Sequence, residues 1–183
     1  AATLLAYVVF TRSMEWKSLS DPSFLPLLLR SQTLFESLNI YSTTAPLIAS
    51  ASLSFAYIDL NDFAAAEKCL LDMYKKVTLV EYEWGIAWSK QHLAELSLRR
   101  GDFFAYLTQL QEALELFSEF GDEWSVKNIT EKLIWQKYLR GEIEDANKLT
   151  KQNLLLYEKD GELDRIAGSY DTLGAIALLQ GEY

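Results

Sequence analysis

Residues 101–142 read GDFFAYLTQLQEALELFSEFGDEWSVKNITEKLIWQKYLRGE, with glycines twenty residues apart. The spacing holds over five glycines, each followed by Asp or Glu, at Gly101, Gly121, Gly141, Gly161 and Gly181. In alternate turns the third residue is bulky and apolar, as in Gly101-Asp102-Phe103 and Gly141-Glu142-Ile143, and Asn61-Asp62-Phe63 extends this series upstream. A fixed period of this length indicates a repeat protein. The repeating unit is therefore forty residues long and contains two helices and two distinct turns.

Other positions recur with the same forty-residue period. One column holds leucine four times, at Leu53, Leu93, Leu133 and Leu173. The N-terminal segment is more degenerate, which suits a terminal repeat that has a neighbour on one side only. We therefore expect a single array over 1–183 without an internal domain boundary. Its repeats are about 1–40, 41–80, 81–120, 121–160 and an incomplete 161–183.

Each half of a unit has the pattern of an amphipathic helix. Apolar residues step by 4, 3, 4 and 3 at Phe103, Leu107, Leu110, Leu114 and Phe117, which places them on one helical face. Glycine adopts the left-handed conformation that ends a helix, and the acid after it suits the start of the next helix. The pattern predicts an all-α solenoid of antiparallel helix pairs. The helices are expected over about 2–17, 23–38, 44–59, 62–79, 83–100, 102–120, 122–140, 142–160 and 162–180.

The composition excludes several classes of protein. The formal net charge of -9 over 183 residues opposes binding to a phosphate backbone, so no direct nucleic-acid contact is expected. One cysteine and one histidine supply neither a disulfide nor the about four ligands of a zinc site. The apolar stretch 4–10 is far shorter than the roughly 20 residues that span a bilayer. We expect a cytoplasmic chain without membrane contact, metal or cofactor, and, since it begins without Met, a fragment of a longer protein.

Residue types that carry catalysis are scarce. His92 and Cys69 are the only imidazole and the only thiol, and they fall in different predicted helices. Carboxylates gather at helix starts, where the helix dipole accounts for them. No glycine-rich phosphate-binding motif is present. The chain is therefore not expected to be an enzyme.

At the C-terminus, Leu173-Gly174 followed by Gly181-Glu182-Tyr183 resembles the first helix and turn of the tetratricopeptide repeat, and Ala66 and Ala146 match its small-residue column. The forty-residue unit is similar to the long variant of this family in MalT-type transcriptional regulators and related signal-transduction ATPases. The resemblance covers 41–183 well and 1–40 loosely. It implies a right-handed superhelix of about four and a half repeats that binds a protein or peptide without catalysis.

A second stripe runs along the first helix of each unit. Trp88, Gln91 and Glu95 step by 3 and 4, and the neighbouring repeats carry further aromatic and acidic residues in the same columns. In tetratricopeptide arrays the matching columns line the concave groove. The resemblance therefore implies a groove for a peptide with apolar and basic residues, lined by Phe55, Trp88, Gln91, Glu95, Asn128, Glu131, Trp135, Tyr138 and Asp171. The alternative is that these aromatic side chains pack in the core.

The function that we expect is a protein- or peptide-binding scaffold, the recognition arm of a larger signalling or transcriptional regulator. The alternative is a module of a MalT-like ATPase regulator that senses a small-molecule inducer. Self-association is a third prediction, because the helix over 162–180 has no second helix of its own repeat in this chain. Its apolar residues Ile166, Tyr170, Leu173 and Ile176 are expected to lack part of their cover.

Overall fold

The computed structural model describes residues 25–38 and 41–181. The helix expected over 2–17 lies outside the described residues. All eight described helices begin and end within two residues of the predicted bounds, and no β-strand occurs in the described part of the chain. The helices are α2 (Leu25–Leu38), α3 (Thr44–Asp59), α4 (Phe63–Leu79), α5 (Glu83–Arg99), α6 (Phe103–Phe120), α7 (Glu123–Leu139), α8 (Ile143–Asp160) and α9 (Leu163–Gln180).

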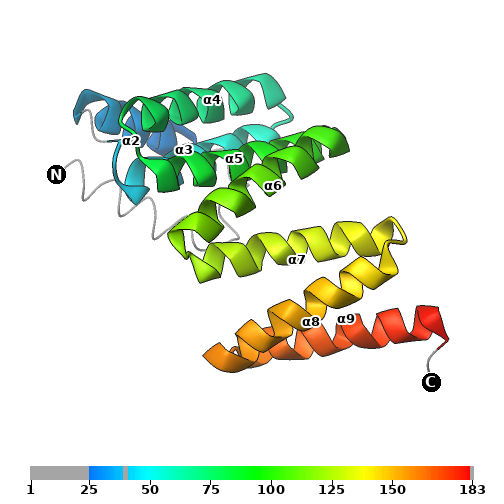
Figure 1. Cartoon of the computed structure of the whole chain (residues 1–183). Coiled ribbons are helices and arrows are strands. Elements are labelled where there is room, and N and C mark those ends of the chain that lie inside the picture. Colours follow the sequence, from blue (N-terminus) through cyan, green and yellow to red (C-terminus); the bar gives the residue numbers. More distant parts are fainter. Residues whose placement is uncertain (1–24, 39–40, 182–183) are drawn as a thin grey trace. The chain divides into compact units, whose positions relative to one another are not determined.

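The chain divides into two compact units, and the boundary between them falls within α6. Unit 1 comprises residues 1–116 and unit 2 comprises residues 117–183. In unit 1, α2 packs on α3, α3 on α4, and α4 on α5; in unit 2, α7 packs on α8 and α8 on α9 (Figure 1). Within each unit, the helices that pack on each other run in opposite directions (Figure 1), so each unit consists of antiparallel helix pairs. The all-α helix-pair solenoid is thereby confirmed, while one uninterrupted array over 1–183 stays a prediction.

The turns have the backbone conformation that the glycine spacing predicts. All five glycines of the series have φ between 68° and 78°, a region that L side chains enter only with strain. The Gly101 N–H donates to the Leu98 carbonyl at 3.0 Å, and the Asp102 N–H donates to that of Ser97 at 2.9 Å. This pair of bonds satisfies carbonyls that the helix end leaves without partners.

Two further turns take the same conformation without glycine. Asn61 has φ of 58° and Glu81 has φ of 53°, and both occupy the glycine column of the twenty-residue series. Asparagine tolerates this region better than other residues because its short polar side chain bonds locally. Glu81 has no such compensation, so the repeat geometry holds it there.

Aspartate and glutamate after these turns behave differently. The carboxylate of Asp62, Asp102 or Asp122 accepts the N–H three residues on, at 3.0, 3.0 and 3.1 Å. Glu142 and Glu162 make no side-chain capping bond. The longer glutamate side chain still places negative charge at the positive end of the helix dipole.

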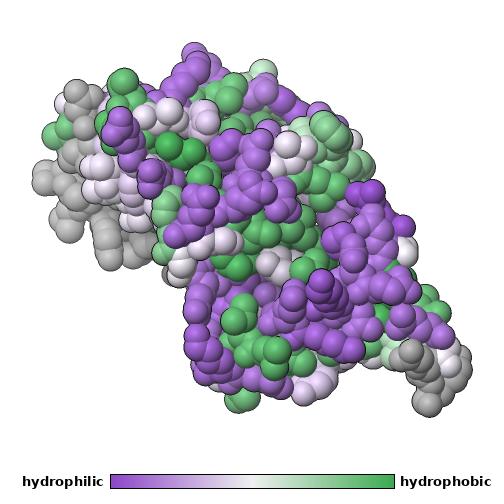
Figure 2. Space-filling view, viewed as in Figure 1, coloured by the Kyte–Doolittle hydropathy of each residue, from purple (hydrophilic) through white to green (hydrophobic). Residues whose placement is uncertain are grey.

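Each unit has its own set of buried core residues. In unit 1, Leu47, Met73 and Val77 form a buried cluster between α3 and α4, against which Trp84 and Trp88 pack. In unit 2 the buried residues include Ile129, Ile134, Ala146, Leu154, Tyr157 and Ile176. The apolar residues of α9 were expected to lack part of their cover. This is wrong for Ile176, which is buried where α9 packs on α8, whereas Tyr170 is 56% exposed. Other hydrophobic side chains are exposed in both units, and Figure 2 shows them in separate areas among hydrophilic ones.

Candidate binding surface

The stripe predicted on α7 lies on one face of unit 2. Asn128, Glu131, Trp135 and Tyr138 step by 3, 4 and 3 along this helix, and we call them the α7 stripe. The Trp135 ring is stacked on that of Tyr138, with centroids 5.7 Å apart and planes 16° apart. Trp135 is 57% exposed, although a large aromatic side chain gains most when it is buried. The α7 stripe therefore presents a preformed aromatic pair to solvent.

Glu131 is a bound carboxylate within this stripe. The Arg165 guanidinium on α9 donates to Glu131 Oε2 at 2.6 Å. Burial raises the pKa of Tyr157 on α8, and the influence of the Glu131 carboxylate raises it further. Through its ion pair with Arg165, Glu131 links α7 to α9, and its negative charge is already neutralised in the unbound chain.

Lys127 is a buried lysine of α7 that helps to hold the α7 stripe in place, and it was not among the predicted site residues. Lys127 is 4% exposed, and its Nζ donates to Asp160 Oδ2 at 2.5 Å and to the Glu162 carboxylate. Burial lowers the pKa of Lys127, but the hydrogen bonds to Asp160 and Glu162 outweigh this effect and raise it above its ordinary value. The ammonium also lies 5.3 Å from the centroid of the Tyr157 ring. The sequence contained a signal for this lysine. The equivalent position of the other repeats is apolar, as Leu47, Ala87 and Ala167, so the repeat pattern places Lys127 in a buried column.

A recess of about 10 Å³ lies beside the α7 stripe, and it is lined by Trp124, Lys127, Asn128, Glu131, Tyr157, Glu162 and Arg165. That volume suits about one water molecule. Asp171 is exposed on α9, and a Cβ added at Gly168, three residues before it, would meet no atom within 4 Å. The recess beside the α7 stripe is therefore too small to enclose a small-molecule ligand.

The predicted site residues of unit 1 are all half-buried. Trp88 on α5 is stacked on His92 with ring centroids 3.7 Å apart, and His92 meets Phe55 of α3 edge-on at 5.8 Å. Because Trp88 also packs on the cluster of Leu47, Met73 and Val77, much of its role is structural. Gln91 and Glu95 lie on the same face of α5, and burial, with Glu95 nearby, raises the pKa of Tyr106 to about 12.

The nine predicted residues are divided between the two units. Phe55, Trp88, Gln91 and Glu95 belong to unit 1, and the other five belong to unit 2. That all nine line one shared groove stays a prediction.

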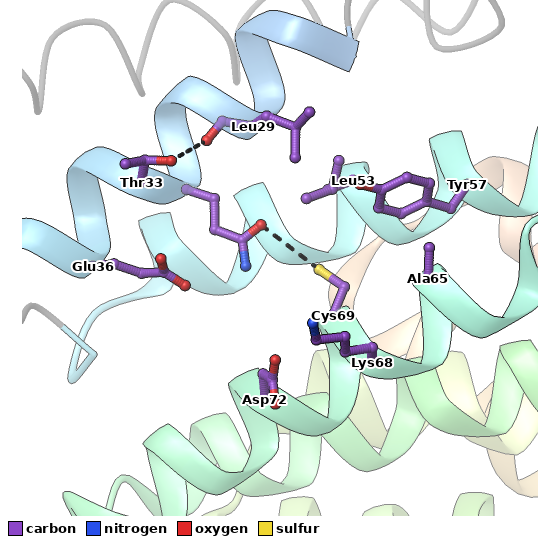
Figure 3. Close-up of a pocket in the computed structure, with 10 residues that line it drawn as sticks. Leu29, Thr33, Glu36, Leu53, Tyr57, Ala65, Lys68, Cys69 and Asp72 are labelled. Carbon is purple, nitrogen blue, oxygen red and sulfur yellow. Dashed lines mark hydrogen bonds between the residues drawn. The ribbon is translucent and has the colours of Figure 1, made fainter.

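A separate cavity of about 390 Å³ lies between α2, α3 and α4 in unit 1, and we call it the α2–α4 cavity. Figure 3 shows Leu29, Leu53 and Tyr57 toward one end and Glu36 and Asp72 toward the other. The remaining lining residues are Gln32, Thr33, Ala65, Lys68 and Cys69. None of the nine predicted site residues lines it, and sequence periodicity offered no signal for it.

Cys69 is buried at the centre of this cavity lining. Its thiol donates to the Ser50 carbonyl at 3.4 Å and lies 4.0 Å from the Gln32 amide oxygen. Burial raises the pKa of Cys69 to about 11, so the reactive thiolate is scarce at neutral pH. His92 contacts Trp88 and Phe55 instead, and it does not activate this thiol.

The described residues contain no group of three or more His, Cys, Asp or Glu side chains placed to hold a metal ion. Over the same residues, every helix is too short or too polar to cross a membrane.

Among the comparisons with known proteins, the comparison with solved structures identifies the fold. No protein-family model matches the chain, and no curated protein matches it. Two crystal structures of a putative kinesin light chain from Podosopora anserina with nearly identical TPR-like repeats, one of a variant, share 13% identity with it at a TM-score of 0.70. The alignments cover 98% of this chain and 86% and 87% of those chains. The crystal structure of BtubC (BKLC) from P. vanneervenii matches at 15% identity and a TM-score of 0.63, over 99% of this chain and 82% of that one. The chain therefore has the fold of tetratricopeptide-like helical repeats.

Proposed function

We propose that this chain is a non-catalytic scaffold of the tetratricopeptide-repeat family that binds a segment of another protein. The observation that carries this proposal is the stacked pair of Trp135 and Tyr138, which leaves Trp135 57% exposed on α7. Aromatic side chains that become buried on association supply much of the binding energy of an interface. The fold supports the proposal, because stacked helix pairs create extended binding surfaces.

The chemistry of the α7 stripe favours a short segment with an apolar anchor. From Asn128 to Tyr138 the helix rises about 15 Å, which matches about five residues of an extended peptide. The amide of Asn128 can bond to peptide backbone, and Arg165 already matches the charge of Glu131. Asp171, exposed on α9, is the carboxylate available to a basic residue of the partner.

We assign the chain to the recognition arm of a larger cytoplasmic regulator of signalling or transcription. The support is the forty-residue unit, which resembles the long variant of MalT-type regulators. The second candidate function is the sensing of a small-molecule inducer by such a regulator. The α2–α4 cavity favours it, because about 390 Å³ falls within the range of ligand pockets, roughly 300–1,000 Å³.

The test of peptide recognition is selection of random heptamers displayed on phage against the immobilised chain. Enriched heptamers are then synthesised, and their affinity is measured by fluorescence anisotropy. We expect Trp135→Ala to weaken binding at least about 30-fold, equivalent to about 2 kcal/mol. Phe104→Ala is the matched control, because Phe104 is 84% exposed on α6, outside the stripe. Failure to enrich any heptamer, or equal loss in both variants, would contradict the proposal.

A further inference from the structure

The two ends of the α2–α4 cavity differ in chemistry. Leu29, Leu53 and the ring of Tyr57 form an apolar end (Figure 3). Glu36 and Asp72 supply carboxylates at the other end (Figure 3), while the hydroxyl of Thr33 donates to the Leu29 carbonyl of its own helix at 2.9 Å. A ligand that fills this space needs an apolar body and a polar head.

The carboxylates differ in whether they are already paired. Lys76 Nζ donates to Glu36 Oε1 at 2.6 Å, so that charge is matched. Asp72 is half-buried and forms no ion pair with any described residue. Lys68 stands four residues before Asp72 on α4, and this order of charges gives the weaker ion pair on a helix. Asp72 is therefore the group at the polar end that gains most from a cation.

We propose that the α2–α4 cavity binds a small amphiphile that carries a protonated amine on an aromatic or branched apolar body. The body lies against Leu29, Leu53 and Tyr57, and the ammonium lies beside Asp72. A hydrogen-bonded ammonium–carboxylate pair is stronger than a neutral hydrogen bond. This inference rests on the second candidate function and is independent of peptide binding by the α7 stripe.

Cys69 provides a direct reporter of occupancy. It is the only cysteine of the chain, it lines the cavity, and burial slows its reaction with thiol reagents. A ligand in the cavity covers the thiol and slows the reaction further. If only the empty protein reacts, a threefold slowing corresponds to a ligand at about twice its Kd.

The experiment compares three probes with one apolar body and different heads: 2-phenylethylamine, 2-phenylethanol and phenylacetate. The rate of Cys69 alkylation by N-ethylmaleimide is followed by intact-mass spectrometry on the full chain. We expect the amine to slow alkylation at least threefold at a concentration where the alcohol slows it less and the carboxylate does not. Equal slowing by all three probes, or none by the amine, would overturn the proposal.

Two variants locate the bound amine. Asp72→Asn should remove the advantage of the amine over the alcohol, whereas Asp59→Asn, at an exposed position of α3 outside the cavity, should keep it. Ala65→Phe fills the cavity and should abolish protection by the amine. If Ala65→Phe lowers the helix content, the comparison of Asp72→Asn with Asp59→Asn decides alone. An amine advantage that survives Asp72→Asn would contradict the proposal, while heptamer binding that depends on Trp135 would be unaffected.

Discussion

The ammonium of Lys127 on α7 lies 2.5 Å from the carboxylate of Asp160 at the end of α8, and the residue is 4% exposed. Glu162, in the turn before α9, accepts a second hydrogen bond from the same ammonium. Asn153 of α8 donates to the Lys127 carbonyl at 3.1 Å. These contacts hold the last turn of α8 against α7 and fix the helix that carries Trp135. The candidate binding surface therefore depends on a polar network inside unit 2.

Loss of the buried ammonium should destabilise unit 2. Lys127→Ala leaves Asp160 and Glu162 without their cation and creates a cavity, so we expect a loss of about 2 kcal/mol of unfolding free energy. This lies below the range for a fully buried pair because both carboxylates are about one-third exposed. Lys159→Ala is the matched control, since its pair with Glu123 is exposed and should contribute about 0.5 kcal/mol or less. Urea unfolding followed by circular dichroism measures both, and an equal effect would refute the role of Lys127.

The ion pair between Lys127 and Asp160 predicts how the stability of the fold depends on pH. The hydrogen bond from Lys127 lowers the pKa of Asp160 below its ordinary value. Its contribution to stability is therefore present above the unfolded pKa of about 3.9 and is lost as the pH falls through the lower folded value. Lys127 has a raised pKa, so its share is present below the unfolded pKa of about 10.4 and is lost as the pH rises through the folded value.

Urea midpoints between pH 5 and pH 2 test the acid side of this dependence. Asp160→Asn should reduce the loss of stability over that interval relative to the parent chain. Asp164→Asn, at an exposed position of α9 that forms no ion pair with any described residue, should leave it unchanged. A steeper loss in Asp160→Asn than in the parent chain would contradict the assignment.

Most of the secondary structure was predictable from the sequence because its turns impose a backbone requirement. Gly101 and Gly141 mark helix ends through positive φ, which depends on local sterics and not on distant partners. Lys127 and Glu131 were harder, since their partners Asp160 and Arg165 lie 33 and 34 residues away. Repeat columns place a residue on a helical face without specifying which charge in the next helix will reach it.

Contacts with other helices, which repeat columns do not specify, also decide the burial of the aromatic residues and the presence of the α2–α4 cavity. Trp88 and Trp135 both belong to the predicted stripe, yet Trp88 packs on the core of unit 1 while Trp135 is exposed on unit 2. The difference arises from neighbouring helices, whose side chains cover one tryptophan and leave the other open. The α2–α4 cavity likewise depends on how side chains of three helices fill the space between them.

Replacing Glu81 by glycine should stabilise the fold. Its φ of 53° lies where a Cβ is strained, so Glu81→Gly should raise the unfolding free energy by about 1 kcal/mol. Gly141→Val is the reverse change at φ of 76° and should cost about 1 kcal/mol or more. Thermal unfolding measures both, and a melting temperature that moves the same way in the two variants would show that the turns are built differently.

The central claim is that Trp135 is a binding anchor and not a core residue, and a paired measurement on Trp135→Ala tests it most directly. The Kd of a selected heptamer and the urea-unfolding free energy are determined for this variant and for Ile129→Ala, which truncates a fully buried residue of α7. We predict that Trp135→Ala raises the Kd at least about 30-fold, equivalent to about 2 kcal/mol, with little change in unfolding free energy. Ile129→Ala should instead cost about 2 kcal/mol or more of stability. If Trp135→Ala destabilises the fold as much as Ile129→Ala, or leaves the Kd unchanged, the account of the α7 stripe is wrong.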